Sequence, residues 1–295
     1  MIAPGGGTKG TNGVAGARGT TGFSKASGMA KGLETAALEP HIPLKTTNHE
    51  TGVTGLSKAN QMIMNSPDWQ AAKRGLLPEA QKVVEQIWTP EQTAKLRTKL
   101  QPGKGLAFVS VPSTSRRNVL PDALGQKLAG ELGGAYVDVK GLYKVHAEDA
   151  MKDLSRAERP FAERSYEVLD SQALAALRNK QVVLTEDVLT TGSSARRFAL
   201  ELRRQGVEVQ TVAGLMGDAR LDSPPQLLSR LQSTLKNAGM NVKGRSLTEV
   251  LSAGEIDTII GLITTGGPHE RRTLAEKLQR LLDTRTAGSL GKHPR

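Results

Sequence analysis

The sequence predicts an α/β fold in which a mainly parallel sheet carries helices on both faces. Two observations support this prediction. Short apolar runs suited to buried strands, at residues 106–111, 181–187 and 207–216, are separated by stretches with helical spacing of Leu and Ala. This β-α alternation spans residues 102–220, and it is typical of parallel sheets because their crossover connections are built from helices. In such sheets a ligand binds at the carboxyl ends of the strands.

The other elements of this segment follow the same alternation. Shorter strands are expected at residues 135–139 and 165–169, and helices at residues 120–132, 171–177 and 194–204. Residues 144–164 are strongly charged and ambiguous, and we expect a helix inside a mobile loop there.

Helical extensions are expected on both sides of this core. Three helix starts lie within residues 61–101, each with proline and an acidic residue in the first turn, and this region forms a helical arm or hood. Residues 221–295 form a C-terminal helical extension, with residues 255–263 compatible with strand or helix. Residues 1–60 are rich in Gly, Ser and Thr and are expected to be disordered, because they cannot bury enough apolar surface.

Composition restricts the chemistry of the 295-residue chain. Basic residues outnumber acidic ones by 40 to 29, a net charge of +11, which favours anionic partners such as phosphorylated metabolites or nucleic acid. The chain has no cysteine, which excludes disulfides and thiolate nucleophiles. No apolar run approaches the ~18 residues of a membrane span, and no signal peptide is visible. We therefore expect a cytoplasmic protein, with a secreted effector as the alternative.

The most informative stretch is Val-Val-Leu-Thr-Glu-Asp-Val-Leu-Thr-Thr-Gly-Ser-Ser, residues 182–194. It consists of a buried strand ending in two acids, a turn rich in hydroxyl groups, and the start of a helix. Backbone N–H groups at a helix N-terminus suit a phosphate, and adjacent carboxylates suit vicinal hydroxyls with a nearby Mg²⁺. A sugar phosphate satisfies both halves of this motif.

This stretch resembles the phosphoribosyl pyrophosphate (PRPP) signature of type I phosphoribosyltransferases, with Thr185 as the one departure, at a position that is usually apolar. The resemblance implies a type I phosphoribosyltransferase-like fold over roughly residues 102–218. It also implies that Glu186 and Asp187 bind the ribose hydroxyls and assist Mg²⁺ indirectly, through those hydroxyls or water. The 5′-phosphate would be bound by the residues of the turn, which are Thr190, Thr191, Gly192, Ser193 and Ser194.

Two further parts of the family pattern have counterparts at suitable distances. The loop after the first strand resembles the pyrophosphate loop, with Ser113, Thr114, Ser115 and Arg116 as candidate ligands and Arg117 as an alternative cation. The charged segment before the main motif resembles the mobile loop of the family, and its Leu-Ser-x-x-x-Arg texture resembles the ComF-like branch. Its candidate closing cations are Lys140, Lys144, Lys152, Arg156 and Arg159.

The resemblance implies an enzyme that transfers the phosphoribosyl group of PRPP to a nitrogen nucleophile and releases pyrophosphate, within nucleotide metabolism. Thr190 stands where the hypoxanthine–guanine branch has Asp, so we expect another base. Homodimers are usual in the family, and we expect one here. Two alternatives stay open: a PRPP- or nucleotide-binding module without turnover, and a nucleic-acid-associated, secreted or mobile-element protein. Four arginines of the helix after the turn are expected to form a solvated basic face, namely Arg196, Arg197, Arg203 and Arg204.

Overall fold

The structure is a computed structural model. It describes residues 40–41, 58–114, 117–147, 154–155, 157–162, 164–217, 221 and 223–287.

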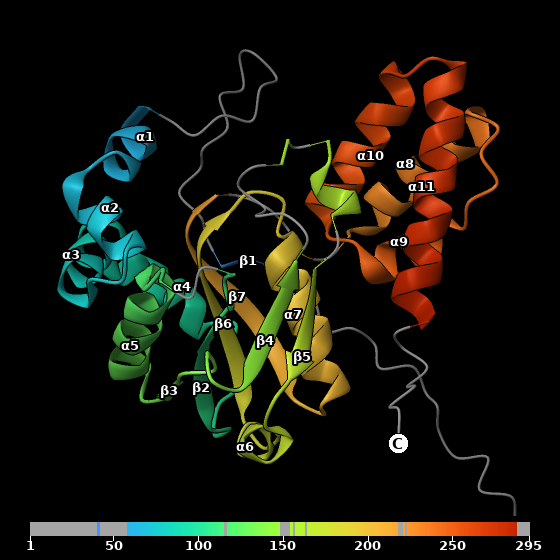
Figure 1. The fold of residues 1–295 in the computed structure, drawn as a ribbon. Helices are drawn as coiled ribbons and strands as arrows, with labels where there is room; N and C mark the ends of the chain where they lie inside the picture. Colours follow the sequence, from blue (N-terminus) through green and yellow to red (C-terminus); the bar gives the residue numbers. More distant parts are fainter. Residues whose placement is uncertain are drawn as a thin grey trace, which may run out of the picture. The chain divides into compact units, whose positions relative to one another are not determined.

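A five-stranded, entirely parallel sheet forms the centre of the α/β core (Figure 1), which confirms the predicted fold class. Its order is β1-β7-β6-β2-β3. The strands are β1 (Pro40–His41), β2 (Leu106–Ser110), β3 (Ala135–Val137), β6 (Gln181–Leu189) and β7 (Glu208–Gly217). Residues 1–60 were expected to be disordered, but residues 40–41 form β1 and residues 58–60 are helical, so the expectation does not hold for them. The rest of residues 1–57 lies outside the described part.

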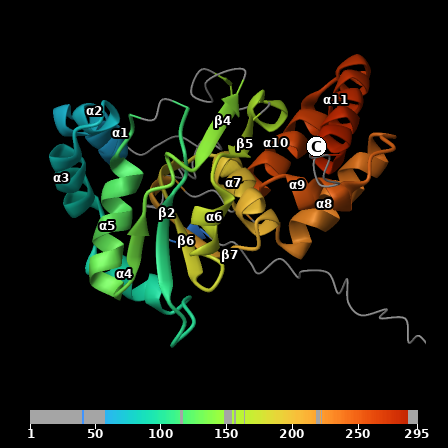
Figure 2. The ribbon, with the colours of Figure 1, turned by 60° about the horizontal axis from the view of Figure 1, so that its bottom comes forward.

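Helices cover both faces of the sheet (Figure 2). α5 (Leu120–Leu132) packs on one face, where Phe108 and Val183 point into the same apolar cluster. α7 (Ser193–Arg204) packs on the opposite face, where Phe198 belongs to one apolar cluster with Val109 of β2 and Val182 of β6. Both faces of β6 are therefore buried, as expected for a central strand of a parallel sheet.

The N-terminal helices share the core of the α5 face. They are α1 (Lys58–Met64), α2 (Pro67–Lys73), α3 (Leu77–Ile87) and α4 (Pro90–Arg97). Ser66 and Thr89 cap α2 and α4 as the sequence predicted, and both helices have proline at the first helical position. Trp69 and Trp88 are fully buried in one cluster with Phe108 of the sheet. This arm is thus continuous with the α/β core.

The described residues of the charged segment before the main motif form a β-hairpin and a 3-10 turn, so they do not contain the helix that was expected within residues 144–164. β4 (Tyr143–Ala147) pairs antiparallel with β5 (Arg164–Val168), and a short 3-10 helix, η1 (Arg159–Phe161), precedes β5. Alternate side chains of β4 are exposed, and these include Lys144 and His146. The strong charge of this strand therefore reflects one solvated face rather than a helix. The short helix α6 (Ser171–Ala175) follows β5.

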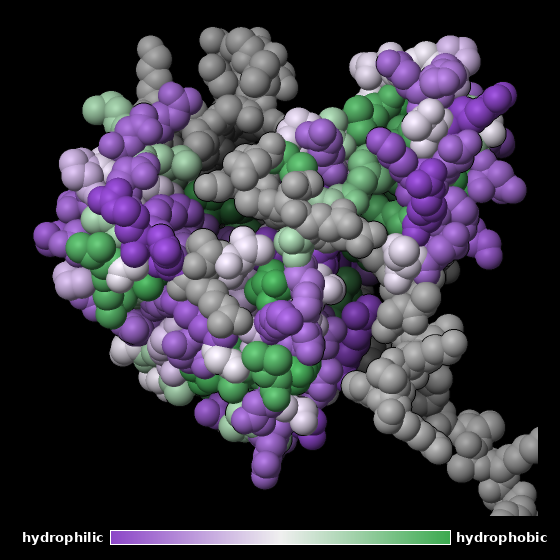
Figure 3. Space-filling model, in the orientation of Figure 1, coloured by the Kyte–Doolittle hydropathy of each residue, from purple (hydrophilic) through white to green (hydrophobic). Residues whose placement is uncertain are grey.

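In the described part of the C-terminal extension, residues 223–287, four helices have an apolar core of their own. They are α8 (Pro225–Asn237), α9 (Gly244–Val250), α10 (Ala253–Thr265) and α11 (Pro268–Ala287). Residues 255–263, which the sequence left undecided, are helical within α10. Hydrophilic residues cover the outer side of α11 (Figure 3), as expected for a helix with one buried face. Among the described residues, no helix is long and apolar enough to cross a membrane.

Candidate functional site

The predicted phosphate turn lies at the carboxyl end of the sheet, between β6 and α7. The strand runs two residues further than expected, to Leu189, and the helix begins at Ser193. Gly192 joins them with a φ of 73°, a left-handed conformation that a side chain would strain. The first N–H groups of a helix have no partner within it. The N-terminus of the 12-residue α7 therefore presents donors and partial positive charge at this turn.

Glu186 is half-buried beside the turn, and its Oε2 atom is buried. No described residue hydrogen-bonds to this oxygen. Burial, reinforced by the neighbouring Asp187 carboxylate, raises the pKa of Glu186 to about 8, although Arg164 and Lys73 oppose the rise. A buried acceptor without a partner costs free energy. The geometry is therefore suited to a hydroxyl group supplied by a ligand.

Asp187 is buried and already has protein partners. The Lys73 ammonium group, at the end of α2, forms an ion pair with its Oδ2 atom. The Asn118 amide donates a hydrogen bond to the same oxygen at 3.0 Å, and the backbone N–H of Val188 donates to Oδ1 at 2.9 Å. The acidic pair is thus asymmetric: the Asp187 carboxylate accepts from three protein donors, whereas Oε2 of Glu186 accepts from no described residue.

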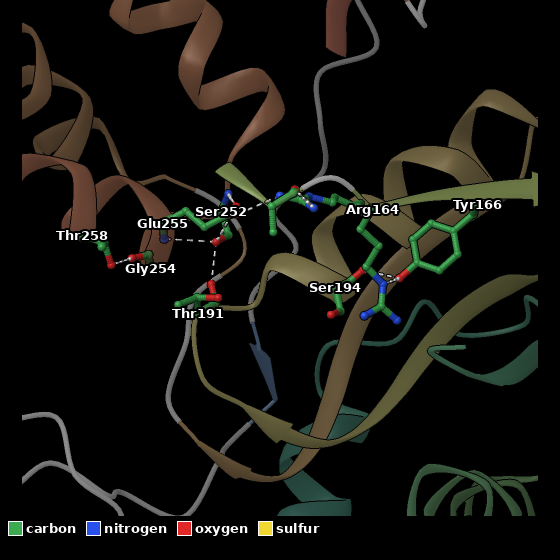
Figure 4. Close-up of polar contacts among 10 residues, drawn as sticks. Arg164, Tyr166, Thr191, Ser194, Ser252, Gly254, Glu255 and Thr258 are labelled. Atoms are coloured by element: carbon green, nitrogen blue, oxygen red, sulfur yellow. Dashed lines mark hydrogen bonds and ion pairs between the residues drawn. The ribbon is translucent and has the colours of Figure 1, made fainter. Parts of the chain in front are cut away.

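The hydroxyl groups of the turn lie in different environments. Thr190 is exposed, and its Oγ1 accepts a hydrogen bond from Nη1 of Arg159 at 2.9 Å. Thr191 is buried, and its carbonyl oxygen accepts from the Ser252 hydroxyl (Figure 4). The Ser193 hydroxyl is buried and no described residue bonds to it. Like Glu186, Ser193 thus offers a polar atom whose partner would come from a ligand.

Ser194 is held from the hairpin side of the turn. Its carbonyl oxygen accepts a hydrogen bond from the Tyr166 hydroxyl at 3.2 Å (Figure 4). Tyr166 in turn accepts from Nε of Arg164 at 3.0 Å. Because burial raises the pKa of Tyr166, this hydroxyl stays protonated and able to donate. Strand β5 therefore fixes the first turn of α7.

Two arginines of α7 were wrongly expected to be solvated. Arg197 is buried and ion-paired with Glu255 of α10 at 3.3 Å, and it donates to the Ala162 carbonyl at 2.8 Å. Arg196 is also buried and lies 3.4 Å from the Glu249 carbonyl. The sequence could not reveal these partners because the nearest of them, Ala162, lies 35 residues from Arg197 along the chain.

The predicted pyrophosphate loop follows β2 as expected. Ser113 and Thr114 lie in it, whereas Ser115 and Arg116 are outside the described residues. The structure adds a cation that the sequence analysis missed, because Nη2 of Arg164 donates to the Pro112 carbonyl at 2.6 Å. Arg164 thereby joins this loop to the Tyr166 side of the phosphate turn. The sequence around Arg164 gave no sign of this role, because Arg164 is one of many charged residues in that segment.

The candidate closing cations occupy three different places. Arg159 reaches the phosphate turn, at Thr190. Lys140 forms an ion pair with the buried Asp122 of α5, which also accepts hydrogen bonds from Ser110 and Tyr136. Lys144 is exposed on β4. The structure thus brings Arg159 to the turn and holds Lys140 against the core, while Lys152 and Arg156 lie outside the described part.

The acidic pair does not form a direct metal site. Asp187 accepts from Lys73, Asn118 and the backbone N–H of Val188, and Glu186 is held largely protonated near neutral pH by its raised pKa. Within the described residues no group of three or more His, Asp or Glu side chains converges. Mg²⁺ prefers several oxygen ligands in octahedral geometry. The residues present therefore fit at most the indirect role expected from the sequence.

Two open cavities lie beside the C-terminal helices. One of about 900 Å³ lies between the hairpin and α11, with Arg164 and Lys277 in its wall. The other, of about 740 Å³, lies between η1 and helices α10 and α11. The first shares Arg164 with the loop after β2, and neither is lined by Glu186 or Asp187.

Comparison with known proteins gives distant likenesses of structure alone. No family model and no curated protein sequence matches the chain. An adenine phosphoribosyltransferase from Thermoanaerobacter pseudethanolicus is 16% identical with a TM-score of 0.30, covering 48% of this chain and 73% of that one. A hypoxanthine phosphoribosyltransferase from Staphylococcus aureus is 19% identical with a TM-score of 0.30, covering 55% and 78%. At these values the functional argument rests on the residues of the chain itself.

Proposed function

We propose that the chain binds PRPP at the turn between β6 and α7 and transfers its phosphoribosyl group to a nitrogen nucleophile, with release of pyrophosphate. The observation that carries the proposal is a pair of buried polar atoms without partners among the described residues, Oε2 of Glu186 and Oγ of Ser193. They flank a helix N-terminus at the carboxyl edge of a parallel sheet. A sugar phosphate satisfies both atoms, since its hydroxyls meet the acid and its phosphate meets the turn.

The roles follow from this placement. Glu186 and Asp187 hold the ribose hydroxyls, and the amides of the turn hold the 5′-phosphate together with Thr190, Thr191, Gly192, Ser193 and Ser194. Arg159, which already contacts Thr190, adds a positive charge beside that phosphate. Ser113 and Thr114, with Ser115 and Arg116, face the pyrophosphate. Arg164 supports this loop through the Pro112 carbonyl.

Catalysis in this proposal is positional and electrostatic. Departure of pyrophosphate leaves positive charge on the ribose ring, which the carboxylate of Asp187 stabilises. Mg²⁺ would neutralise charge on the pyrophosphate oxygens, since the described residues give it no direct ligand set. The accepting base is one other than hypoxanthine or guanine, because Thr190 replaces the acid of that branch. A homodimer and a cytoplasmic location remain predictions of the sequence.

Calorimetric titration with PRPP in the presence of Mg²⁺ tests the binding step. The wild-type chain should bind, and a Glu186→Gln/Asp187→Asn variant should lose at least about tenfold in affinity, because amides replace both carboxyl groups that meet the ribose hydroxyls and Asp187 loses its charge. The matched control is Asp257→Asn/Glu276→Gln, which removes two exposed acids from the C-terminal helices and should bind normally. Equal affinity of wild type and the first variant would contradict the proposal.

A second candidate function is a PRPP- or nucleotide-binding module without turnover. It is favoured by the ion pair between Lys73 and Asp187, which commits one of the two acids before any ligand arrives. The two candidates differ in pyrophosphate release. Incubation with PRPP, Mg²⁺ and a panel of nitrogenous bases should release pyrophosphate with at least one base if the chain is an enzyme, whereas binding without release supports the module.

A further inference from the structure

Lys73 reaches the acidic pair from a part of the chain outside the α/β core. It is the last residue of α2, and its ammonium group pairs with Asp187 of β6. The Lys73 side chain is 36% exposed, whereas that of Asp187 is 8% exposed. The ammonium group therefore lies at the boundary between the buried carboxylate and the open side of the site.

The position of Lys73 is fixed by the packing of α2. Trp69, one turn earlier, is fully buried, and the ammonium group lies 5.6 Å from the centre of its ring. The carbonyl of Ala72 accepts a hydrogen bond from the backbone N–H of Val119 at 3.2 Å. This bond joins the end of α2 to the segment that carries Asn118, the second donor to the same carboxylate oxygen. Lys73 and Asn118 are thus placed as one unit.

The bonding of Asp187 places a positive charge where a metal ion would contact that carboxylate. Oδ2 is shared by an ammonium and an amide group, and Oδ1 accepts a backbone N–H. An ammonium group has three N–H donors, so its pairing with Asp187 leaves others for a ligand. A hydroxyl of a bound ribose beside Glu186 and Asp187 would lie next to these donors.

We propose that Lys73 is a ligand-binding residue that supplies, at the acidic pair, the positive charge that a divalent cation would otherwise supply. This inference rests on the proposed function, because it concerns the sugar half of the same site. It names a consequence that the sequence motif does not: binding of a ribose phosphate without a pyrophosphate group is independent of Mg²⁺.

Ribose 5-phosphate is the probe that isolates this effect, since it lacks the pyrophosphate on which Mg²⁺ would bind. Calorimetric titration is carried out with Mg²⁺ and, separately, with EDTA. The wild-type chain is expected to bind with affinities within about twofold in the two conditions. Lys73→Met should bind at least about tenfold more weakly in EDTA, because a charge-assisted hydrogen bond is lost. Mg²⁺ should restore part of that affinity by occupying the vacated side of Asp187.

Lys82→Met is the matched control. Lys82 is exposed on α3 in the same N-terminal arm, so this variant makes the same charge change away from the acidic pair and should behave as wild type. Lys73→Arg keeps the charge and should keep affinity independent of Mg²⁺, which separates the charge from the packing of the side chain. Thermal denaturation of each variant shows whether it is folded.

The outcomes separate this inference from the function on which it rests. Binding of PRPP by a wild-type chain that needs Mg²⁺ to bind ribose 5-phosphate would overturn the role of Lys73 and leave the proposed function standing. The same conclusion follows if folded Lys73→Met matches wild type in EDTA. Failure of the wild type to bind either compound would overturn both. The wild-type comparison needs no variant, so it decides the matter even if Lys73→Met does not fold.

Discussion

The two helical extensions are attached to the α/β core in different ways. The N-terminal helices share its apolar cluster, with Trp69 and Trp88 packed in the same core as Phe108 of the sheet. The C-terminal helices instead have an apolar core of their own. Their contacts with α7 and the phosphate turn include polar ones, chiefly those of Glu255 with Arg197 and of Ser252 with Thr191.

This difference indicates separate roles for the two extensions: one stabilises the α/β core, and the other positions residues of the phosphate turn. Apolar burial is non-directional and grows with area, so the N-terminal arm stabilises the sheet as a whole. A few buried polar bonds depend on geometry, so the C-terminal helices act on the residues that they touch. Both extensions nevertheless reach the site, through Lys73 on one side and Ser252 on the other.

Trp69→Ala should give the largest effect, because it removes a fully buried ring from the shared cluster. We expect the free energy of unfolding to fall by about 3–5 kcal/mol, as for other large-to-small core substitutions. Urea denaturation followed by circular dichroism measures it. Met62→Ala is the control, since Met62 is 74% exposed on α1 and should change stability little. A small loss for Trp69→Ala would mean that the arm is not part of the core.

Glu255→Gln should come next, because it leaves the Arg197 guanidinium buried without its ion pair. The two side chains are 0% and 7% exposed. Removal of one partner of a buried pair costs about 3 kcal/mol, and here we expect the loss to appear first as faster proteolysis of α10. Asp257→Asn breaks an exposed pair with Arg230 and should be nearly neutral. If the sheet and α10 of Glu255→Gln unfold in a single transition, both extensions are attached to the core in the same way.

Glu186→Gln tests whether burial of the Glu186 carboxyl makes the stability of the chain depend on pH. The pKa of Glu186 is about 8 in the folded chain against an ordinary 4.5, so the folded state binds more protons between these values. The stability that Glu186 contributes is therefore present below about pH 4.5 and is lost as pH rises through about 8. We expect wild type to lose on the order of 1–3 kcal/mol more than Glu186→Gln over this range.

Melting temperatures of both proteins at about pH 5 and about pH 8.5 provide the measurement. Glu276→Gln, which changes an exposed acid on α11, should retain the pH dependence of wild type. An identical slope for wild type and Glu186→Gln would show that this carboxyl is not held in its protonated form by burial.

Local sequence signals predicted the elements of the core well. Proline and acidic residues at helix starts, and the apolar run of β6, marked α2, α4 and the central strand near their observed ends. The motif also placed Glu186 and Gly192 at the edge of the sheet, because a strand that ends in acids and a glycine turn has few alternatives. These signals succeed because they depend on neighbours in the chain.

The partners of the site residues could not be predicted in this way. Lys73 is more than a hundred residues from Asp187. A lysine in the last turn is common in helices, so its presence there did not indicate a role at the site. Arg197 was expected to be solvated because its burial depends on Glu255, which the sequence placed in an undecided segment. The hairpin at residues 143–168 was missed for a related reason: its charged side chains lie on the solvated face of a strand.

Ser252→Ala should give the smallest effect on stability and the most local one. The Ser252 hydroxyl caps α10 by accepting from the N–H of Glu255, and it donates to the Thr191 carbonyl in the phosphate turn. Loss of a cap costs about 1 kcal/mol. The control is Ser229→Ala, whose hydroxyl bonds within α8 and is remote from the turn.

For both serine variants, the affinity for inorganic phosphate is measured together with the free energy of unfolding. Close packing ties the two helix ends together, because a Cβ on Gly254 would lie 2.7 Å from the Thr191 carbonyl oxygen. Ser252→Ala should therefore weaken phosphate binding, whereas Ser229→Ala should leave it unchanged. If the two serine variants bind phosphate equally well, the C-terminal helices hold the turn by packing alone, and the polar contacts set only the stability of α10.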